Sequence, residues 1–204
     1  KKTLQFGALA GAAALLLAGC ASAAQPASDP ADSAAAPDGP RVAVGYEGGV
    51  LVLGGDDYAN LGEFDSEDFI RLNAAGDGRH VMVTTSKGFQ LLDVQQPQLT
   101  DLVVPAATAG HVVSHGGKTV LYDDATSDTT IFDSAELAKA GDALPKAEVV
   151  PGVTAHHGVS VELEDGTLLT TVGDESGRTG IRVLDEDRNE VASNDECPGV
   201  HGEG

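Results

Sequence analysis

The chain has 204 residues and a formal net charge of −20, because 32 Asp and Glu outnumber 12 Lys and Arg. Such an acidic surface repels nucleic acid and attracts cations, so no nucleic-acid partner is expected. Aromatic residues make up only 4% of the chain, Trp is absent, and there are 26 Gly and 9 Pro. This composition favours short strands over long helices and predicts an all-β fold with a core of Val, Leu, Ile and Ala.

Residues 1–20 are expected to be a targeting signal rather than part of the fold. Two lysines precede an apolar run at residues 6–17, which is too short to span a membrane comfortably. The run ends in the letters LAGC, and this order of features resembles a bacterial lipobox. The resemblance implies that Cys20 is lipidated and anchors the protein at the outer face of the cell membrane or in the periplasm. The alternative is an ordinary secretory signal cleaved near residues 21–23, which also predicts export.

Residues 21–40 are small, polar and punctuated by proline. Such a composition cannot bury enough apolar surface to fold. We therefore expect a flexible tether between the anchor and a folded domain at residues 41–204.

From residue 41 onward, short apolar segments alternate with turns rich in Gly and Asp. Val42 and Val44 alternate with small residues in the way a half-buried strand requires. Residues 54–66 are expected to form a loop or an outer edge strand, and residues 134–140 a short helical turn with Ser134 as N-cap. Strands are expected at residues 42–44, 50–53, 81–85, 89–93, 112–114, 119–122 and 129–133.

The histidines mark a repeat. His80, His111, His157 and His201 recur at intervals of 31 to 46 residues, each near the start of a new unit. A repeat of about 40 residues with three or four short strands is typical of a β-propeller blade. Residues 41–204 would hold about four blades, fewer than a ring normally needs to close, so we expect an N-terminal fragment of a longer propeller. A small, complete β-sandwich is the alternative.

Some of these histidines are candidates for one metal site. Neutral imidazole is a good zinc ligand, and residues at the starts of successive innermost strands converge at the rim of a propeller channel. His111, His157 and His201 come from successive units, and His156 adjoins His157. The four are therefore the candidate zinc ligands.

Other polar residues are expected to have structural roles. His115 lies four residues after His111, about 13 Å along a strand, so the two should not share an ion. His80 and His115 are each more simply explained as structural or surface groups. Asp93, Asp133 and Asp185 end apolar strands, where carboxylates usually cap turns.

Cys197 is the second of two cysteines. A lone thiol is unusual in an oxidising compartment, so a disulfide to a region beyond this chain is one interpretation. Direct zinc ligation by Cys197 is the other. The sequence contains no G-x-S-x-G, P-loop or G-x-G-x-x-G motif that would indicate an enzyme.

Four stretches carry a family resemblance. They read GHVVSHGGKT at residues 110–119, HHGV at 156–159, DGTLL at 165–169 and CPGVHGE at 197–203. Over residues 41–204 the chain resembles the AztD-type zinc metallochaperones. The resemblance implies an exported β-propeller, not an enzyme, that delivers zinc to the solute-binding protein of a zinc ABC importer. It also implies zinc ligands at His111, at His156 or His157, and at His201.

Two other functions remain open from the sequence. The same histidines would serve a propeller hydrolase or lyase if they held a catalytic metal with an open coordination position. A non-catalytic surface-binding module would need none of them for metal. Zinc binding without turnover favours the first function, turnover the second, and the absence of any zinc effect the third.

Overall fold

The computed structural model describes residues 39–200, which form fifteen strands and one short helix. Cys20, most of the tether at residues 21–40, and His201 lie outside the described residues. The chain divides into two units, Lys1–Ala34 and Ala35–Gly204, and every described residue belongs to the second. Within residues 39–200, no helix is long and apolar enough to cross a membrane.

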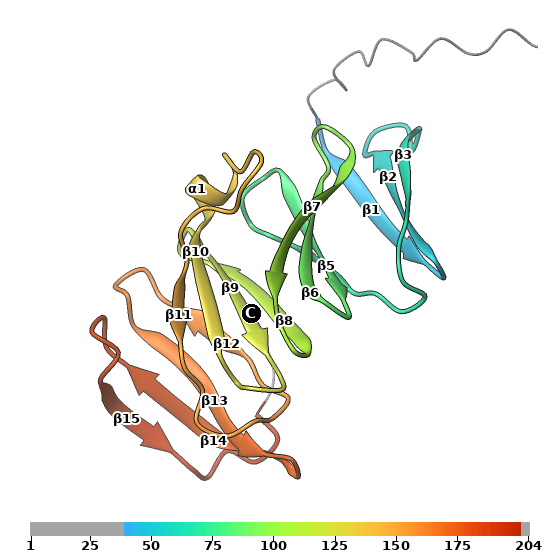
Figure 1. The fold of residues 1–204 in the computed structure, drawn as a ribbon. Coiled ribbons are helices and arrows are strands. Elements are labelled where there is room, and N and C mark those ends of the chain that lie inside the picture. Colours follow the sequence, from blue (N-terminus) through green and yellow to red (C-terminus); the bar gives the residue numbers. More distant parts are fainter. Residues whose placement is uncertain (1–38, 201–204) are drawn as a thin grey trace, which may run out of the picture. The chain divides into compact units, whose positions relative to one another are not determined.

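The strands form four antiparallel sheets that follow one another along the chain (Figure 1). The first sheet has three strands and the others have four, each hydrogen-bonded in chain order. The strands of the first two sheets are β1 (Arg41–Tyr46), β2 (Gly49–Gly54) and β3 (Asn60–Asp65), then β4 (Leu72–Ala74), β5 (His80–Thr85), β6 (Gly88–Asp93) and β7 (Gln98–Pro105). Those of the last two are β8 (Ala109–His115), β9 (Lys118–Asp123), β10 (Thr129–Asp133) and β11 (Glu148–Val150), then β12 (Ser160–Glu162), β13 (Leu168–Asp174), β14 (Gly177–Leu184) and β15 (Glu190–Asn194).

Each sheet packs only against its neighbours, through one apolar layer. Val50 and Val52 of the first sheet meet Val83 and Leu92 of the second. A larger cluster joins the second and third sheets, and another joins the third and fourth. Short antiparallel sheets stacked in this way are the blades of a β-propeller. The prediction of an all-β propeller is confirmed, and the β-sandwich alternative is wrong, because a sandwich would bury one core between two facing sheets.

One end of every sheet carries the connections to its neighbours. These connections are residues 66–71, 106–108 and 151–159, and we call this side of the molecule the connection end. The turn between the second and third strands of a four-stranded sheet returns to the same end. In the second sheet, for example, Ser86 of that turn hydrogen-bonds Glu67 of the preceding connection.

The first sheet corresponds to the second, third and fourth strands of the others. Its β1–β2 turn contacts the next connection, since the Ser66 amide donates to the Gly48 carbonyl at 2.8 Å. In the four-stranded sheets, the turn at this end joins the second strand to the third. Within the described residues, β1 therefore presents an edge where the other sheets carry an innermost strand.

Most of the expected strands are found, and residues 54–66 contain the outer edge strand β3. The helix α1 (Ser134–Leu137) is also found, but its expected N-cap is wrong by one residue. The carboxylate of Asp133 caps the helix, accepting from the amides of Ala135 and Glu136. Ser134 is instead buried, and its hydroxyl lies 2.9 Å from that of Thr119. Asp has the longer side chain and the charge that the helix N-terminus favours.

Candidate metal centre

His111 lies near the connection end of β8, at a local irregularity in the strand. The pairing of β8 with β9 shifts register between Ala109 and Val112, so residues 110 and 111 form a bulge. A bulge redirects a side chain that a regular strand would point elsewhere. Gly110 is required here, because a Cβ at this position would collide with the carboxylate of Asp124. The bulge therefore allows Asp124 to approach the backbone beside His111.

His157 lies in the connection between β11 and β12 and faces His111. The two imidazole centroids are 5.0 Å apart. Two imidazoles on one tetrahedral zinc ion, each with a Zn–N distance of about 2.0–2.1 Å, place their ring centres about 5 Å apart. The spacing is therefore compatible with a shared ion. Residues 151–159, which contain His157, connect the third sheet to the fourth, whereas His111 lies on β8, the innermost strand of the third sheet. The fold therefore brings together two histidines that are far apart in the sequence.

Asp124 holds His157 from the turn that follows β9. Its Oδ2 lies 2.6 Å from Nδ1 of His157, and its Oδ1 accepts the Gly158 amide at 3.4 Å. The Asp124 side chain is only 13% exposed, whereas that of His157 is 46% exposed. Metal-binding histidines commonly donate one ring N–H to a carboxylate and present the other nitrogen to the metal. Asp124 is placed to fix the tautomer of His157 that carries its proton on Nδ1.

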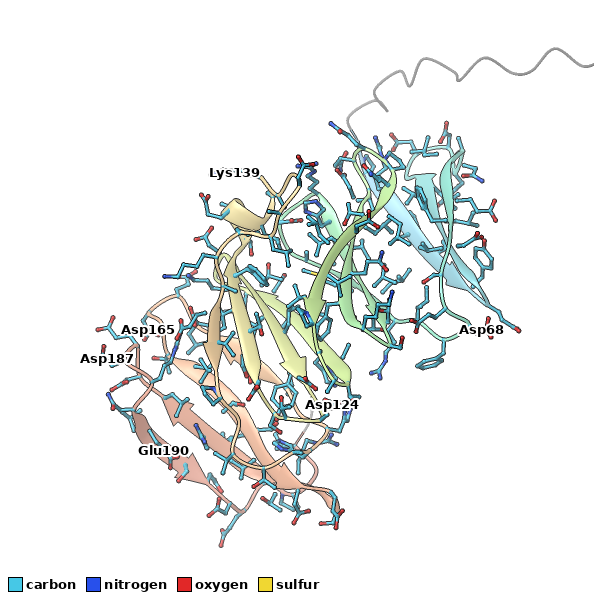
Figure 2. The ribbon with its side chains drawn as sticks, viewed as in Figure 1. Asp68, Asp124, Lys139, Asp165, Asp187 and Glu190 are labelled. Atoms are coloured by element: carbon cyan, nitrogen blue, oxygen red, sulfur yellow. The ribbon has the colours of Figure 1, made fainter. Side chains whose placement is uncertain are left out.

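Figure 2 labels Asp124 at the connection end, which is the lower side of that view. Asp68, from the connection between β3 and β4, lies on the same side, whereas Lys139 lies at the opposite end of the third sheet. The candidate centre is therefore on the side of the molecule where the connecting loops are exposed.

His156 lies beside His157 but has a different environment. It is buried, and its ring nitrogens contact hydroxyl and carbonyl oxygens rather than carboxylates. Burial also raises the pKa of the Tyr122 phenol, although hydrogen bonds with Ser127 and Thr171 oppose that shift. Tyr122 therefore stays a protonated hydroxyl next to the His156 ring. Of the adjacent pair, His157 reaches the surface and His156 does not.

His80 and His115 lie away from this centre. His80 begins β5 at the end opposite to the connection end, and its Nδ1 lies 2.6 Å from buried Asp77. His115 is the last residue of β8 and is exposed, whereas His111 is near the start of the same strand. The carboxylates expected to cap turns also do so: Asp93 accepts from the amides of Gln95 and Gln96.

The segment that precedes His201 is fixed close to His157. Arg178 donates from Nη1 to the carbonyl of His157 at 2.9 Å. The backbone carbonyl of the same arginine accepts the Gly199 amide at 2.9 Å. Cys197 is a half-buried free thiol whose amide bonds to Thr179. The disulfide expected for Cys197 stays a prediction.

Across residues 39–200, no three His, Cys, Asp or Glu side chains are arranged as a complete metal-binding group. The described part of the candidate centre consists of two imidazoles and one orienting carboxylate. Its geometry suits a soft or borderline divalent cation such as zinc more than calcium or magnesium, which prefer oxygen ligands. Asp124 is the member that sequence reasoning missed.

Comparison with known proteins finds a zinc chaperone of similar sequence and fold. No family model matches the chain. The zinc chaperone AztD of Citrobacter koseri is 29% identical over 114 residues, which are 54% of this chain and 26% of that protein. The structure of apo AztD from the same organism matches with a TM-score of 0.66 and 21% identity, over 79% of this chain and 48% of that one. The chain has an AztD-like fold.

A second AztD crystal structure from Citrobacter koseri gives the same TM-score of 0.66. The chain spans about half the length of these AztD structures. The likeness to these structures establishes the propeller fold.

Proposed function

We propose that this protein carries zinc outside the cytoplasm and delivers it to the solute-binding protein of a zinc ABC importer. The observation that carries the proposal is the arrangement of His157, which is held by Asp124 at 2.6 Å with the His111 ring 5.0 Å away. Similarity to the zinc chaperone AztD supports zinc as the cargo. In this proposal zinc is the ion that the protein transports, not a permanently bound cofactor. The proposal includes no catalytic step.

In this proposal His157 and His111 bind zinc through one ring nitrogen each, and His201 supplies a further ligand. His201 follows Val200, and the preceding Gly199 is bonded to Arg178, which in turn contacts His157. This connectivity supports placing His201 at the same ion. His156 is not among the proposed ligands, because its ring is engaged in the interior.

Delivery would occur by replacement of one ligand at a time. His157 is 46% exposed at the connection end, so an incoming ligand can reach the ion while other ligands still hold it. The formal net charge of −20 attracts cations to the surface. Imidazoles must be neutral to bind, so acidification weakens the site and favours release.

The proposal also includes export. Lipidation at Cys20 would leave residues 21–40 as a tether that lets the connection end reach a membrane-associated partner. Labelling with a radioactive fatty acid tests the anchor directly, and Cys20→Ala should abolish incorporation.

Zinc titration of the purified protein against a chromophoric chelator tests the binding site. We expect one tight site, and His157→Ala should weaken it by about 100-fold or more, since it removes a ligand. Asp124→Asn should cost about 10- to 100-fold, which is typical when the group orienting a ligand is lost. His201→Ala tests the proposed further ligand in the same assay.

His115→Ala is the matched control, because His115 is exposed and lies at the other end of the strand that carries His111. Its zinc affinity should equal that of the unaltered protein. If His157→Ala and His111→Ala also leave the affinity unchanged, the proposed site is wrong. Delivery is tested separately, by mixing zinc-loaded protein with the apo solute-binding protein in excess chelator. Direct transfer loads the partner despite the chelator, and release into solution does not.

A further inference from the structure

The ring nitrogens of His156 lie within hydrogen-bond distance of four polar groups. Its Nδ1 lies 2.8 Å from the Thr154 carbonyl and 3.0 Å from the Ser127 hydroxyl. Its Nε2 lies 2.9 Å from the Thr171 hydroxyl and 3.1 Å from the Tyr122 hydroxyl. The ring is buried beside a cavity of about 40 Å³ whose lining includes the same groups. A cavity of this size has room for water.

The hydrogen bonds assign the tautomer of His156. The Thr154 carbonyl can only accept, so Nδ1 must carry the proton and donate to it. Nε2 forms its hydrogen bond with the hydroxyl of Thr171 or Tyr122. Both ring nitrogens of His156 are therefore engaged by groups of the interior.

These contacts join three elements that determine the geometry of the candidate metal centre. Ser127 belongs to the turn that begins with Asp124, and its hydroxyl also accepts the His156 amide at 3.2 Å. Thr171 belongs to β13, and its hydroxyl accepts the Val159 amide at 3.0 Å. Because His156 precedes His157 directly, the buried ring fixes the backbone of His157 and the turn that carries its carboxylate partner.

Gly158 shows how closely the groups are packed. A Cβ there would come too close to Nε2 of His156, the Thr171 hydroxyl and the Tyr122 hydroxyl. The residue after His157 must therefore be glycine for the network to form. Its amide also reaches Asp124. Network and metal centre thus share the short segment from His156 to Gly158.

We infer that His156 is a positioning residue for the zinc centre and does not bind zinc. The inference rests on the proposed function, because it concerns how that centre is held. In it, the hydrogen bonds of His156 with Ser127 and Thr154 hold the turn of Asp124 against the connection of His157. Loss of these hydrogen bonds leaves every ligand present but lets their separation vary, and this lowers zinc affinity.

The first test is the long-range ¹H–¹⁵N spectrum of the histidine side chains, recorded without zinc and during zinc addition. His156→Asn identifies the signals of residue 156. We expect the Nδ1–H pattern for His156 in both states, while the His157 and His111 nitrogens shift on zinc addition. A metal-induced shift of a His156 ring nitrogen would overturn the inference.

The second test compares zinc affinities of variants at a temperature where each is folded. His156→Ala should weaken zinc binding by about 10- to 100-fold, as expected for an orienting group. His156→Asn, whose amide can replace the Nδ1–H donor to Thr154, should recover part of that loss. Ser127→Ala removes no possible ligand from the network and should weaken binding in the same direction. Unchanged affinity in His156→Ala and Ser127→Ala would reduce His156 to an ordinary core residue and refute the positioning role.

The two proposals fail in different ways. If the unaltered protein binds no zinc, the proposed function is wrong, although the tautomer of His156 can still be read from the spectrum. If zinc binds and shifts His157 but the His156 variants bind it normally, only the positioning role fails.

Discussion

The histidines within residues 39–200 differ in what surrounds them. His80 and His156 are both buried, but His80 pairs with a carboxylate and His156 with neutral oxygens. His157 has a carboxylate partner like His80, yet its ring reaches solvent. A carboxylate partner combined with exposure is the feature that makes His157 the best ligand candidate.

The Asp77–His80 pair predicts a pH dependence of stability. Burial tends to raise the pKa of Asp77, but hydrogen bonds from the His80 ring and from the amides of His80 and Arg79 outweigh it, so the pKa lies below its ordinary value. The side chains of Asp77 and His80 are 0% and 2% exposed. A depressed carboxyl pKa stabilises the fold above the unfolded pKa of about 3.9, and this contribution disappears as the pH falls through the folded value.

Asp77→Asn should therefore lower the free energy of unfolding at neutral pH by about 3 kcal/mol, because it breaks a buried pair. The difference from the unaltered protein should shrink as the pH falls below about 4. Denaturant unfolding at several pH values measures both effects. A difference that stays constant down to pH 2 would show that the charge of Asp77 is not the cause.

At the scale of elements, the sequence predicted strands better than it predicted their local irregularities. Alternating Val and Leu between Gly-rich turns was sufficient to place most strands, because burial of one face imposes a period of two. The bulge at residues 110 and 111 has no such signal, since it depends on the pairing of β8 with β9. The position of Asp124 beside His157 depends on that pairing and on the connection 151–159, so it could not be predicted from strand patterns.

Arg188 joins two neighbouring sheets. From the turn between β14 and β15, it bonds Glu148 of β11 through Nε and Nη2, and Glu162 of β12 at 2.6 Å. Glu162 is buried, with its side chain 5% exposed, and Lys118 is 3.8 Å from it. Glu162 therefore depends most on Arg188, because without Arg188 this buried carboxylate would lose its closest charged partner.

Arg188→Met should lower the free energy of unfolding by about 3 kcal/mol, because it leaves a buried carboxylate largely unpaired. Glu148→Gln is the matched control: Glu148 is 48% exposed, so its ion pair should contribute less than about 1 kcal/mol. Thermal and denaturant unfolding of the two variants would separate these cases. Equal losses would mean that burial of Glu162 does not decide the effect.

At the scale of the whole molecule, β1 is the feature that distinguishes the first sheet. Val42, Val44 and Tyr46 are exposed, and the edge of β1 has no strand beside it within residues 39–200. An apolar edge strand of six residues is a template for pairing with another chain. A fragment limited to residues 39–200 should therefore self-associate at high concentration.

Val44→Lys should reduce this association, because a charge on an edge strand opposes pairing. Val149→Lys is the control, since Val149 is exposed on the three-residue outer strand β11, which is too short to pair well. Sedimentation velocity at increasing protein concentration measures the effect. If both variants associate as much as the unaltered protein, the β1 edge is not the contact.

The propeller fold itself could be predicted from the recurrence of short strands and Gly-containing turns, because each blade repeats the same chain path. The histidine repeat was only partly right: His111 and His157 lie near the first strand of a sheet, but His80 begins the second strand of its sheet, β5. The difference between His156 and His157 could not be predicted. Adjacent residues of one type have the same propensities, and only the packing of β9, β13 and the turn at Ser127 shows which ring is buried.

The inward ring of His156 and the outward ring of His157 also restrict how this protein can evolve. Deleting or inserting one residue just before the pair would exchange their directions, pushing one ring into the hydroxyl-lined interior and pulling the other away from it. The connection at residues 151–159 is therefore intolerant of changes in length. The segment at residues 138–147 lies at the opposite end of the third sheet, so a change in its length would leave the spacing ahead of the two histidines unaltered, although Ala140 packs against the core there.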